Sequence, residues 1–147
     1  MKVASVLFAS LLFLTVNSDW GTDLTKAKQQ ASTENKYILL NFSGSDWCGP
    51  CIRMHKEIFE SEGFRTLAAD KLVLVNADFP RLKKNQLSKE LQKSNEVLAD
   101  QYNPGGIFPL TVLLNAEGKM IKNWEGFPEG TPENFLSQLK SAMNAAN

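Results

Sequence analysis

The sequence predicts an α/β fold made of a strand–helix–strand unit, a later β-hairpin and flanking helices. Residues 37–42 and 72–78 are apolar runs of strand length, and helical patterns separate them. Two such strands are expected to be parallel, joined by a right-handed crossover. With 147 residues, of which 43% are hydrophobic, the chain is long enough for one well-filled core. We find no internal repeat and no second domain.

The first 18 residues have the pattern of a secretory signal peptide. Lys2 precedes an uncharged run over residues 3–16, and small residues before and at Ser18 fit a cleavage site. A membrane anchor is the alternative, but this run is shorter than the roughly 20 apolar residues that span a bilayer. We therefore expect cleavage near Ser18, a mature domain over 19–147, and a periplasmic or secreted location.

The first half of the predicted domain supplies the strand–helix–strand unit. A surface helix over 23–35 has apolar residues at helical spacing. The strand over 37–42 is almost wholly apolar, which favours a central position buried on both faces. After a turn, a helix begins at Pro50 and is expected to break at Gly63. A shorter helix over 64–69 then leads to the second strand.

The second half begins with the least regular part of the chain. Residues 79–103 predict a loop followed by a helix. Residues 110–114 and 119–125 predict a hairpin with turn-forming residues between them, and Thr131-Pro132 opens a final helix. Basic residues crowd the first half of the irregular region, where a solvated face and a docking site both remain open: Arg81, Lys83, Lys84, Lys89 and Lys93.

The only two cysteines of the chain lie in the stretch Trp47-Cys48-Gly49-Pro50-Cys51, between a predicted strand and a predicted helix. A Cys-x-x-Cys pair can close a small disulfide ring. The first N–H groups of a helix and the positive end of its dipole stabilise a thiolate. The pair is therefore a candidate for reversible dithiol–disulfide chemistry.

Other uses of two cysteines fit the sequence less well. A structural zinc site needs four ligands, and beyond the cysteines the chain offers only one histidine, His55. Haem attachment requires a histidine directly after the second cysteine, where Ile52 stands. Two cysteines cannot hold a four-cysteine iron–sulfur cluster. An inert disulfide closing so short a loop adds little stability. We expect no metal and no cofactor.

The charge balance narrows the classes of partner. Lys and Arg together number 16, as do Asp and Glu, so no overall field favours nucleic acid or an acidic membrane surface. We expect no nucleic-acid partner and a monomeric protein.

The order of elements, together with the motif, resembles the thioredoxin family over about residues 20–143. In secreted thioredoxin-like proteins a Trp precedes the first helix, and a Lys-x-hydrophobic strand leads to Trp-Cys-x-x-Cys. The segment Met-x-x-Glu-hydrophobic-Phe follows. These features match Trp20, residues 36–42, residues 47–51 and residues 54–59. The resemblance implies a thioredoxin-like fold with a central mixed β-sheet flanked by helices.

The segment before the predicted hairpin also resembles this family. Pro109 falls where the family keeps a cis-proline, which lies against the active-site sulfurs and lets an extended substrate pair with the backbone. A trans proline at a strand start is the alternative. By resemblance, the substrate-binding residues are Trp47, Gly49, Pro50, Phe108 and Pro109.

Two positions depart from the family pattern. Asn41 stands where thioredoxin has a buried aspartate, and an amide cannot accept a proton as a carboxylate does. The family role of deprotonating the second cysteine therefore falls to water, to another carboxylate such as Asp78, or to no residue at all. Lys56 replaces the proline that kinks the family's helix, and a straighter helix is expected.

The resemblance implies a role for each cysteine. Cys48, expected to be exposed at the helix start, is the nucleophile, and the deeper Cys51 resolves the mixed disulfide. A nearby Asp46 would raise the pKa of Cys48. We expect His55 to be a partly exposed surface residue outside the site.

These features predict a thiol–disulfide oxidoreductase. Because Gly49-Pro50 is the dipeptide of thioredoxin, we expect a reductant of exported proteins. Its partners would be protein disulfides and a membrane-embedded dithiol electron donor. The alternative is a non-catalytic binding or chaperone-like module that uses the Phe108-Pro109 groove and whose cysteines are incidental.

Overall fold

The computed structural model describes residues 19–146, so the predicted signal peptide lies outside the described residues. Within them no helix is long and apolar enough to cross a membrane. The strands are β1 (Tyr37–Ser43), β2 (Leu72–Asp78), β3 (Leu110–Leu114) and β4 (Met120–Glu125). The α-helices are α1 (Leu24–Glu34), α2 (Gly49–Met54), α3 (Glu62–Lys71), α4 (Lys89–Tyr102) and α5 (Pro132–Ala145). A π-helix, η1 (His55–Phe59), continues α2, and a 3-10 helix, η2 (Lys83–Asn85), precedes α4.

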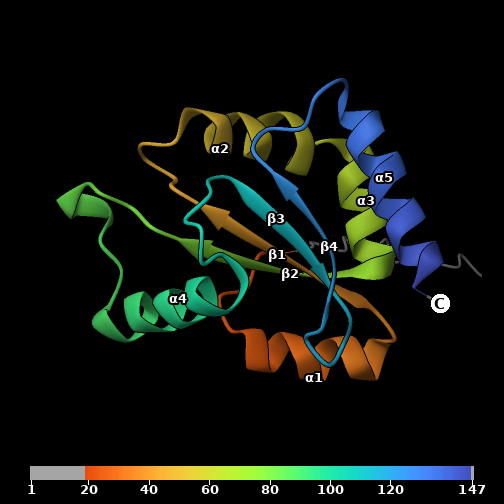
Figure 1. The fold of residues 1–147 in the computed structure, drawn as a ribbon, viewed down its shortest axis with the longest axis horizontal. Helices are drawn as coiled ribbons and strands as arrows, with labels where there is room; N and C mark the ends of the chain where they lie inside the picture. Colours follow the sequence, from red (N-terminus) through yellow and green to blue (C-terminus); the bar gives the residue numbers. More distant parts are fainter. Residues whose placement is uncertain (1–18, 147) are drawn as a thin grey trace, which may run out of the picture.

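The strands form one sheet in the order β2-β1-β3-β4. β1 runs parallel to β2, with Ser43 opposite Asp78, and antiparallel to β3, with Phe42 opposite Leu110. β3 and β4 form the predicted antiparallel hairpin. The mixed sheet flanked by helices confirms the predicted fold class (Figure 1).

Each face of the sheet carries its own hydrophobic core. On one face, side chains such as Leu39 and Leu113 pack against α2, α3 and α5, where Phe64 and Phe135 are fully buried. On the other, Ile38 and its neighbours pack against α1 and α4. Figure 1 shows these two helical layers on opposite sides of the sheet. β1 is apolar on both faces because it lies between the two cores.

The helices after the motif differ from the sequence prediction. The predicted break between the two helices occurs, but at Glu60 and Ser61 and not at Gly63, because Ser61 caps α3 by accepting a hydrogen bond from the Phe64 N–H. α3 therefore exceeds the predicted range of 64–69. The helix containing Lys56 is also not one regular helix, since α2 widens into the π-helix η1. Lys56 in place of the family's proline avoids one cause of helix irregularity, but a π-helical turn is another cause.

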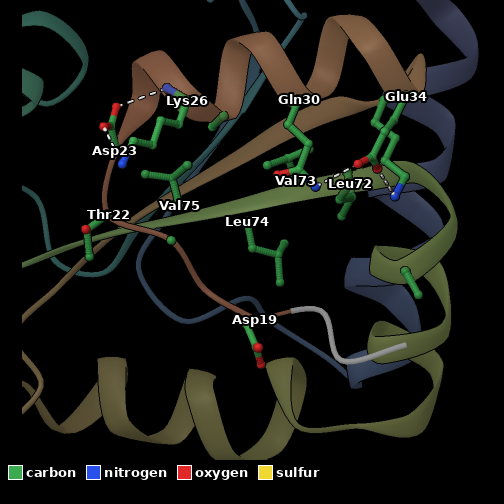
Figure 2. Close-up of a pocket in the computed structure, with 14 residues that line it drawn as sticks. Asp19, Thr22, Asp23, Lys26, Gln30, Glu34, Leu72, Val73, Leu74 and Val75 are labelled. Carbon is green, nitrogen blue, oxygen red and sulfur yellow. Dashed lines mark hydrogen bonds and ion pairs between the residues drawn. The ribbon is translucent and has the colours of Figure 1, made fainter. Parts of the chain in front are cut away.

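The chain enters the fold beside β2. Gly21 forms a parallel bridge with Val75, donating its N–H to the Leu74 carbonyl and accepting from the Asn76 N–H. Asp23 then caps α1 by accepting from the Lys26 N–H. A hollow of about 560 Å³ lies between α1 and β2. Figure 2 shows the residues that line it. None of the predicted site residues lines this hollow.

Candidate active site

The motif follows the C-terminal end of β1, after a turn over residues 44–46. Cys48 is the N-cap of α2, and its sulfur accepts a hydrogen bond from the Cys51 N–H at 3.3 Å. A disulfide joins Cys48 and Cys51, whose Cα atoms are 5.2 Å apart. The helix start thus directs its N–H groups toward the sulfur of the first cysteine, which favours the thiolate form when the disulfide is reduced.

Both cysteines are buried in this disulfide form. Cys48 is 3% exposed and Cys51 5%, so the expected contrast between an exposed nucleophile and a deeper partner is wrong here. The residues between them, Gly49 and Pro50, are exposed, and the neighbouring Ile52 is 47% exposed. A partner therefore meets the backbone and side chains around the sulfurs before it meets the sulfurs themselves.

The turn between β1 and Cys48 is closed by Gly44 and Trp47. The Gly44 carbonyl accepts from the Trp47 and Cys48 N–H groups. The indole of Trp47 lies directly over Gly44, where a Cβ atom would be 2.3 Å from the ring carbon Cε2. Only glycine leaves room for the indole at this position, so Gly44 sets the orientation of the motif's tryptophan.

Three aromatic rings gather on the outer side of the motif; we call Trp47, Phe79 and Phe108 the aromatic cluster. Phe108 lies edge-on to both of the other rings, with centroid distances of 5.5 Å to each. The Trp47 indole N–H donates to the Phe79 carbonyl at 2.8 Å. The Arg81 guanidinium lies over the Trp47 ring, 3.7 Å from its centroid. The structure thus brings together the predicted residues Trp47 and Phe108.

Pro109 lies at the same end of the sheet. Leu110 is opposite Phe42, so the preceding proline is level with the point where β1 leaves the sheet for the motif. The Phe108–Pro109 bond is cis, as predicted. Pro109 is buried, and its carbonyl accepts from the Gly126 N–H at 2.8 Å.

Neutral polar side chains form a network on the inner side of the motif; we call Asn41, Ser43, Asn76 and Thr111 the amide network. Asn41 donates from Nδ2 to Asn76 Oδ1 at 3.0 Å, and the Ser43 hydroxyl, which shares its single hydrogen with Asp78 Oδ1, is 3.2 Å from the same oxygen. The Thr111 hydroxyl donates to Asn41 Oδ1 at 3.2 Å. Asn41 is therefore held by partners on two neighbouring strands.

A cavity of about 430 Å³ joins this network to the second cysteine. Asn41, Ser43, Asn76 and Cys51 all contribute to its wall. The titratable residues that also line it are His55, Lys56 and Glu60. His55 Nε2 is 3.3 Å from Glu60 Oε1, and both side chains are 59% exposed. His55 is thus exposed as expected, but it lines the cavity of Cys51, so its expected place outside the site is wrong.

Asp78 does not line this cavity. One carboxylate oxygen accepts from the Ser43 hydroxyl and the Ser45 N–H, and the other accepts from the Ser45 hydroxyl at 2.5 Å. The side chain instead lines a separate hollow beside Phe79 and Pro80. Asp78 was one of the possible acceptors of the Cys51 proton. Its carboxylate instead binds Ser43 and Ser45 and so holds the turn before the motif.

Asp46 also has a role that the sequence did not predict. Its carboxylate accepts from the Arg81 and Leu82 N–H groups at 2.9 and 3.0 Å, and from the Asn85 amide. These bonds, with that from the Arg81 N–H the largest cause, hold the pKa of Asp46 below its ordinary value. The carboxylate is directed at the segment after β2, and we call these three bonds the Asp46 clamp.

Sequence reasoning missed Phe79, Arg81 and Asn76. Asn76 could have been found, because it occupies the same position in β2 that Asn41 occupies in β1, and parallel pairing in register places the two side by side. The contacts of Phe79 and Arg81 depend on the path of an irregular segment and had no such signal. Among residues 19–146, no group of three or more His, Cys, Asp or Glu side chains is placed to hold a metal ion.

Comparison with known proteins agrees with this geometry. The chain matches the family described as thioredoxin-like over residues 19–116. It is 36% identical over 127 residues to the disulfide bond reductase DsbH of Chlamydia pneumoniae, covering 86% of this chain and 74% of that protein. It is 29% identical to the thioredoxin-related protein DsbJ of the same organism, but spans only 42% of that protein's length.

Solved structures point the same way. The structure of a DsbH oxidoreductase aligns with a TM-score of 0.78 and 33% identity, covering 97% of this chain and 95% of that one. Together with the disulfide between Cys48 and Cys51, these matches confirm the prediction of a thiol–disulfide oxidoreductase. Fold, motif and sequence relatives all agree that the chain belongs to the thioredoxin-like family.

Proposed function

We propose that this protein reduces disulfides in exported proteins, with Cys48 as the nucleophile and Cys51 as the resolving cysteine. The observation that carries the proposal is the Cys48–Cys51 disulfide at the start of α2, where the Cys48 sulfur already accepts a helix N–H. The thioredoxin dipeptide Gly49-Pro50 and the relative named as a disulfide bond reductase support the reducing direction.

The reaction consists of two exchanges that conserve atoms and electrons. The Cys48 thiolate attacks one sulfur of a partner disulfide, forming a mixed disulfide and releasing one partner thiolate. Cys51 then loses its proton and attacks the Cys48 sulfur, which closes the intramolecular disulfide and releases the second partner thiolate. The cysteine pair gives up two electrons and the partner gains them.

The Cys51 proton has few acceptors in its cavity, because His55 and Glu60, which also line it, are 59% exposed and lie 3.3 Å from each other. Asn41, Ser43 and Asn76 have no ionised carboxylate to accept it, and Asp78 lines another hollow. The cavity is large enough to admit water and has several polar partners for it. We therefore assign the first acceptor of this proton to water in the cavity.

The substrate segment would lie in an extended form beside Pro109. The aromatic cluster supplies an apolar surface, and the exposed Gly49 and Pro50 leave the backbone around the sulfurs open to approach. Strand-like pairing beside the cis-proline would align the partner disulfide with Cys48. This assigns substrate binding to Trp47, Gly49, Pro50, Phe108 and Pro109.

The proposed function also requires a location and an electron source. The signal-peptide pattern of residues 1–18 supports export and a mature chain over 19–147. An exported reductant must be re-reduced, so we propose a membrane-embedded dithiol donor as its partner. N-terminal sequencing of the protein recovered from cell fractions tests the location, and an uncleaved chain in the membrane fraction would refute it.

The reduction potential decides the direction. We expect a value near that of thioredoxin, about −270 mV, when the purified protein is equilibrated against dithiothreitol or glutathione buffers. A potential above about −180 mV, the value for protein disulfide isomerase, would make the protein an oxidant or isomerase. If the variant with both cysteines changed to serine keeps its cellular role, the alternative binding module is correct.

A further inference from the structure

We propose that the basic segment over residues 81–93 is a docking surface for acidic protein substrates, placed so that a bound Asp/Glu-rich segment presents its disulfide to Cys48. The inference rests on the proposed function and extends it to substrate choice. It follows from three features of the segment: its uncompensated charge, its attachment to the motif, and its position at the active end of the sheet.

The segment has far more positive than negative charge. Glu90 is its only acidic residue, which leaves the segment with a net charge of +4, while the rest of the chain has 11 basic and 15 acidic residues. The basic residues are Arg81, Lys83, Lys84, Lys89 and Lys93, and all five are exposed. Within residues 19–146 none of them forms an ion pair, whereas Lys26, Lys36, Arg53 and Lys71 each pair with a neighbouring carboxylate. The charge of the segment is thus available to a partner.

The segment is fixed to the residues directly before Cys48. The Asp46 clamp holds the backbone of Arg81 and Leu82 and the side chain of Asn85. Trp47 donates its indole N–H to the Phe79 carbonyl and lies beneath the Arg81 guanidinium. Because Asp46 and Trp47 immediately precede the nucleophile, these contacts fix the position of Arg81 and η2 relative to Cys48.

The far end of the segment is anchored as well. The Ser88 side chain caps α4 by accepting from the Leu91 N–H, and Asn95 donates from Nδ2 to the Asp78 carbonyl at the end of β2. Lys89 and Lys93 are four residues apart in α4, so they lie on one helix face. In Figure 1 the segment with η2 projects from the same end of the sheet as the loop that leads to α2.

A protein substrate fits this arrangement better than an anionic membrane. A surface that only binds lipid headgroups has no need for a fixed position relative to the sulfurs, and here three hydrogen bonds accepted by Asp46, directly before the motif, supply one. Clustered charge beside a reactive site steers oppositely charged partners toward it. This steering weakens with salt, because the screening length falls to about 8 Å at 0.15 M ionic strength.

The test compares two disulfide peptides of equal length, one with Asp and Glu flanking the disulfide and one with Ser and Gln. The measured quantity is the ratio of kcat/KM for the acidic peptide to kcat/KM for the neutral peptide. The variant is Lys83→Gln/Lys84→Gln. The matched control, Lys119→Gln/Lys140→Gln, removes the same charge from exposed residues. Those two residues lie beside the β3–β4 turn and the hollow around it, at the opposite end of the sheet.

We expect the wild-type ratio at low salt to be about threefold to tenfold, because electrostatic steering raises association rates by tenfold or more. It should fall toward one in Lys83→Gln/Lys84→Gln and at high salt, and stay at the wild-type value in the control. A wild-type ratio of one, or an equal loss in both variants, would overturn the proposal. Wild-type turnover of the neutral peptide separately tests the proposed function.

Sedimentation with phosphatidylserine vesicles tests the competing occupant. Vesicle binding that the Lys83→Gln/Lys84→Gln variant loses, together with a peptide ratio of one, would assign the surface to a membrane and refute the docking of acidic proteins. An absence of vesicle binding alongside the acidic preference supports the protein substrate.

Discussion

Beneath Cys51 the chain places neutral amides and hydroxyls, whereas beside Cys48 it places an ionised carboxylate, a guanidinium and three aromatic rings. The inner side draws its residues from three neighbouring strands, so the register of the sheet sets their positions. The outer side draws on a turn and an irregular segment, held together by side-chain contacts between residues more than thirty positions apart.

The contrast separates two tasks around one disulfide. The amide network presents uncharged dipoles to the cavity of Cys51, whose titratable lining residues, His55, Lys56 and Glu60, are exposed. The outer side concentrates charge and apolar surface where a partner arrives. Changes on the inner side should therefore alter stability and sulfur chemistry, while changes on the outer side should alter partner choice.

The largest expected effect is at the disulfide itself. Cys51→Ser should abolish catalytic turnover and accumulate mixed disulfides on Cys48, because no second thiol remains to release the partner. Mass spectrometry of the protein after incubation with oxidised substrate measures this. Cys48→Ser is the matched variant and should form no such adducts, so adducts on Cys51 but not on Cys48 would reverse the assigned roles.

A carboxylate introduced into the amide network would remove the difference in charge between the two sides of the disulfide. Asn41→Asp should lower the free energy of unfolding by about 2–4 kcal/mol at pH 7, because it buries a charge and loses the donor to Asn76 Oδ1. Denaturant unfolding measures this change. Asn123→Asp, on an exposed face of β4, is the control and should change stability by no more than about 0.5 kcal/mol.

The pH dependence of this variant has a defined sign. Burial disfavours the ionised form, so the pKa of the introduced carboxyl is higher in the folded than in the unfolded state. Below the unfolded value of about 3.9 both states bind the proton and the cost of burying the charge is absent; this cost grows as the pH rises above that value. A deficit that is constant with pH would show that the carboxyl reaches solvent.

A smaller effect tests whether the amide network acts as a unit. Thr111→Val removes the hydroxyl that donates to Asn41 Oδ1 and should cost about 1–2 kcal/mol of unfolding free energy. Adding Asn41→Leu removes the acceptor that was left unpaired. The double variant should therefore be more stable than the sum of the single changes by about 1 kcal/mol. Simple additivity would show that the two side chains are not coupled.

The smallest effect on the stability of the whole protein is expected from a change on the outer side. Asp46→Asn removes the charge of the Asp46 clamp and acceptor capacity for Leu82 and Asn85. We expect amide hydrogen exchange at Arg81 and Leu82 to rise several-fold while the unfolding midpoint scarcely moves. Glu117→Gln, an exposed acid in the β3–β4 turn, is the control. Unchanged exchange at both amides would show that the clamp does not hold the segment.

The clamp in the wild type should also respond to pH. The pKa of Asp46 is lower in the folded state, chiefly because the Arg81 N–H donates to the ionised form. Its stabilisation is therefore present above the ordinary aspartate value of 3.8 and is lost only as the pH falls through the lower folded value. NMR titration of the Arg81 amide should show a midpoint below 3.8, and a midpoint above it would contradict the assignment.

The contrast also explains how far sequence reasoning reached. The runs at 37–42 and 72–78 and the hairpin were predictable because strands buried on both faces are apolar and turns have characteristic residues. The position of Asn41 was predictable from its distance to the motif. Residues on the inner side lie at regular positions of paired strands, so periodicity carries information about them.

On the outer side only Trp47 and Phe108 had a signal, the resemblance to the family, and the other contacts had none. Asp46 was expected to act on Cys48, but its carboxylate binds Arg81, Leu82 and Asn85, residues that only the folded path of the loop brings near. The burial of Cys48 was missed for the same reason, since it depends on packing around the turn. Gly63 suggested a break, but the Ser61 cap determined where α3 begins.

Gly44 and Gly49 differ in how much change each would tolerate. A side chain at Gly44 would collide with the Trp47 indole, while a Cβ at Gly49 would meet no atom within 4 Å. An engineer who wishes to retune the redox behaviour can therefore add a Cβ atom at Gly49, between the cysteines, without displacing a neighbour. The tryptophan before them is fixed in place by a residue that has no side chain.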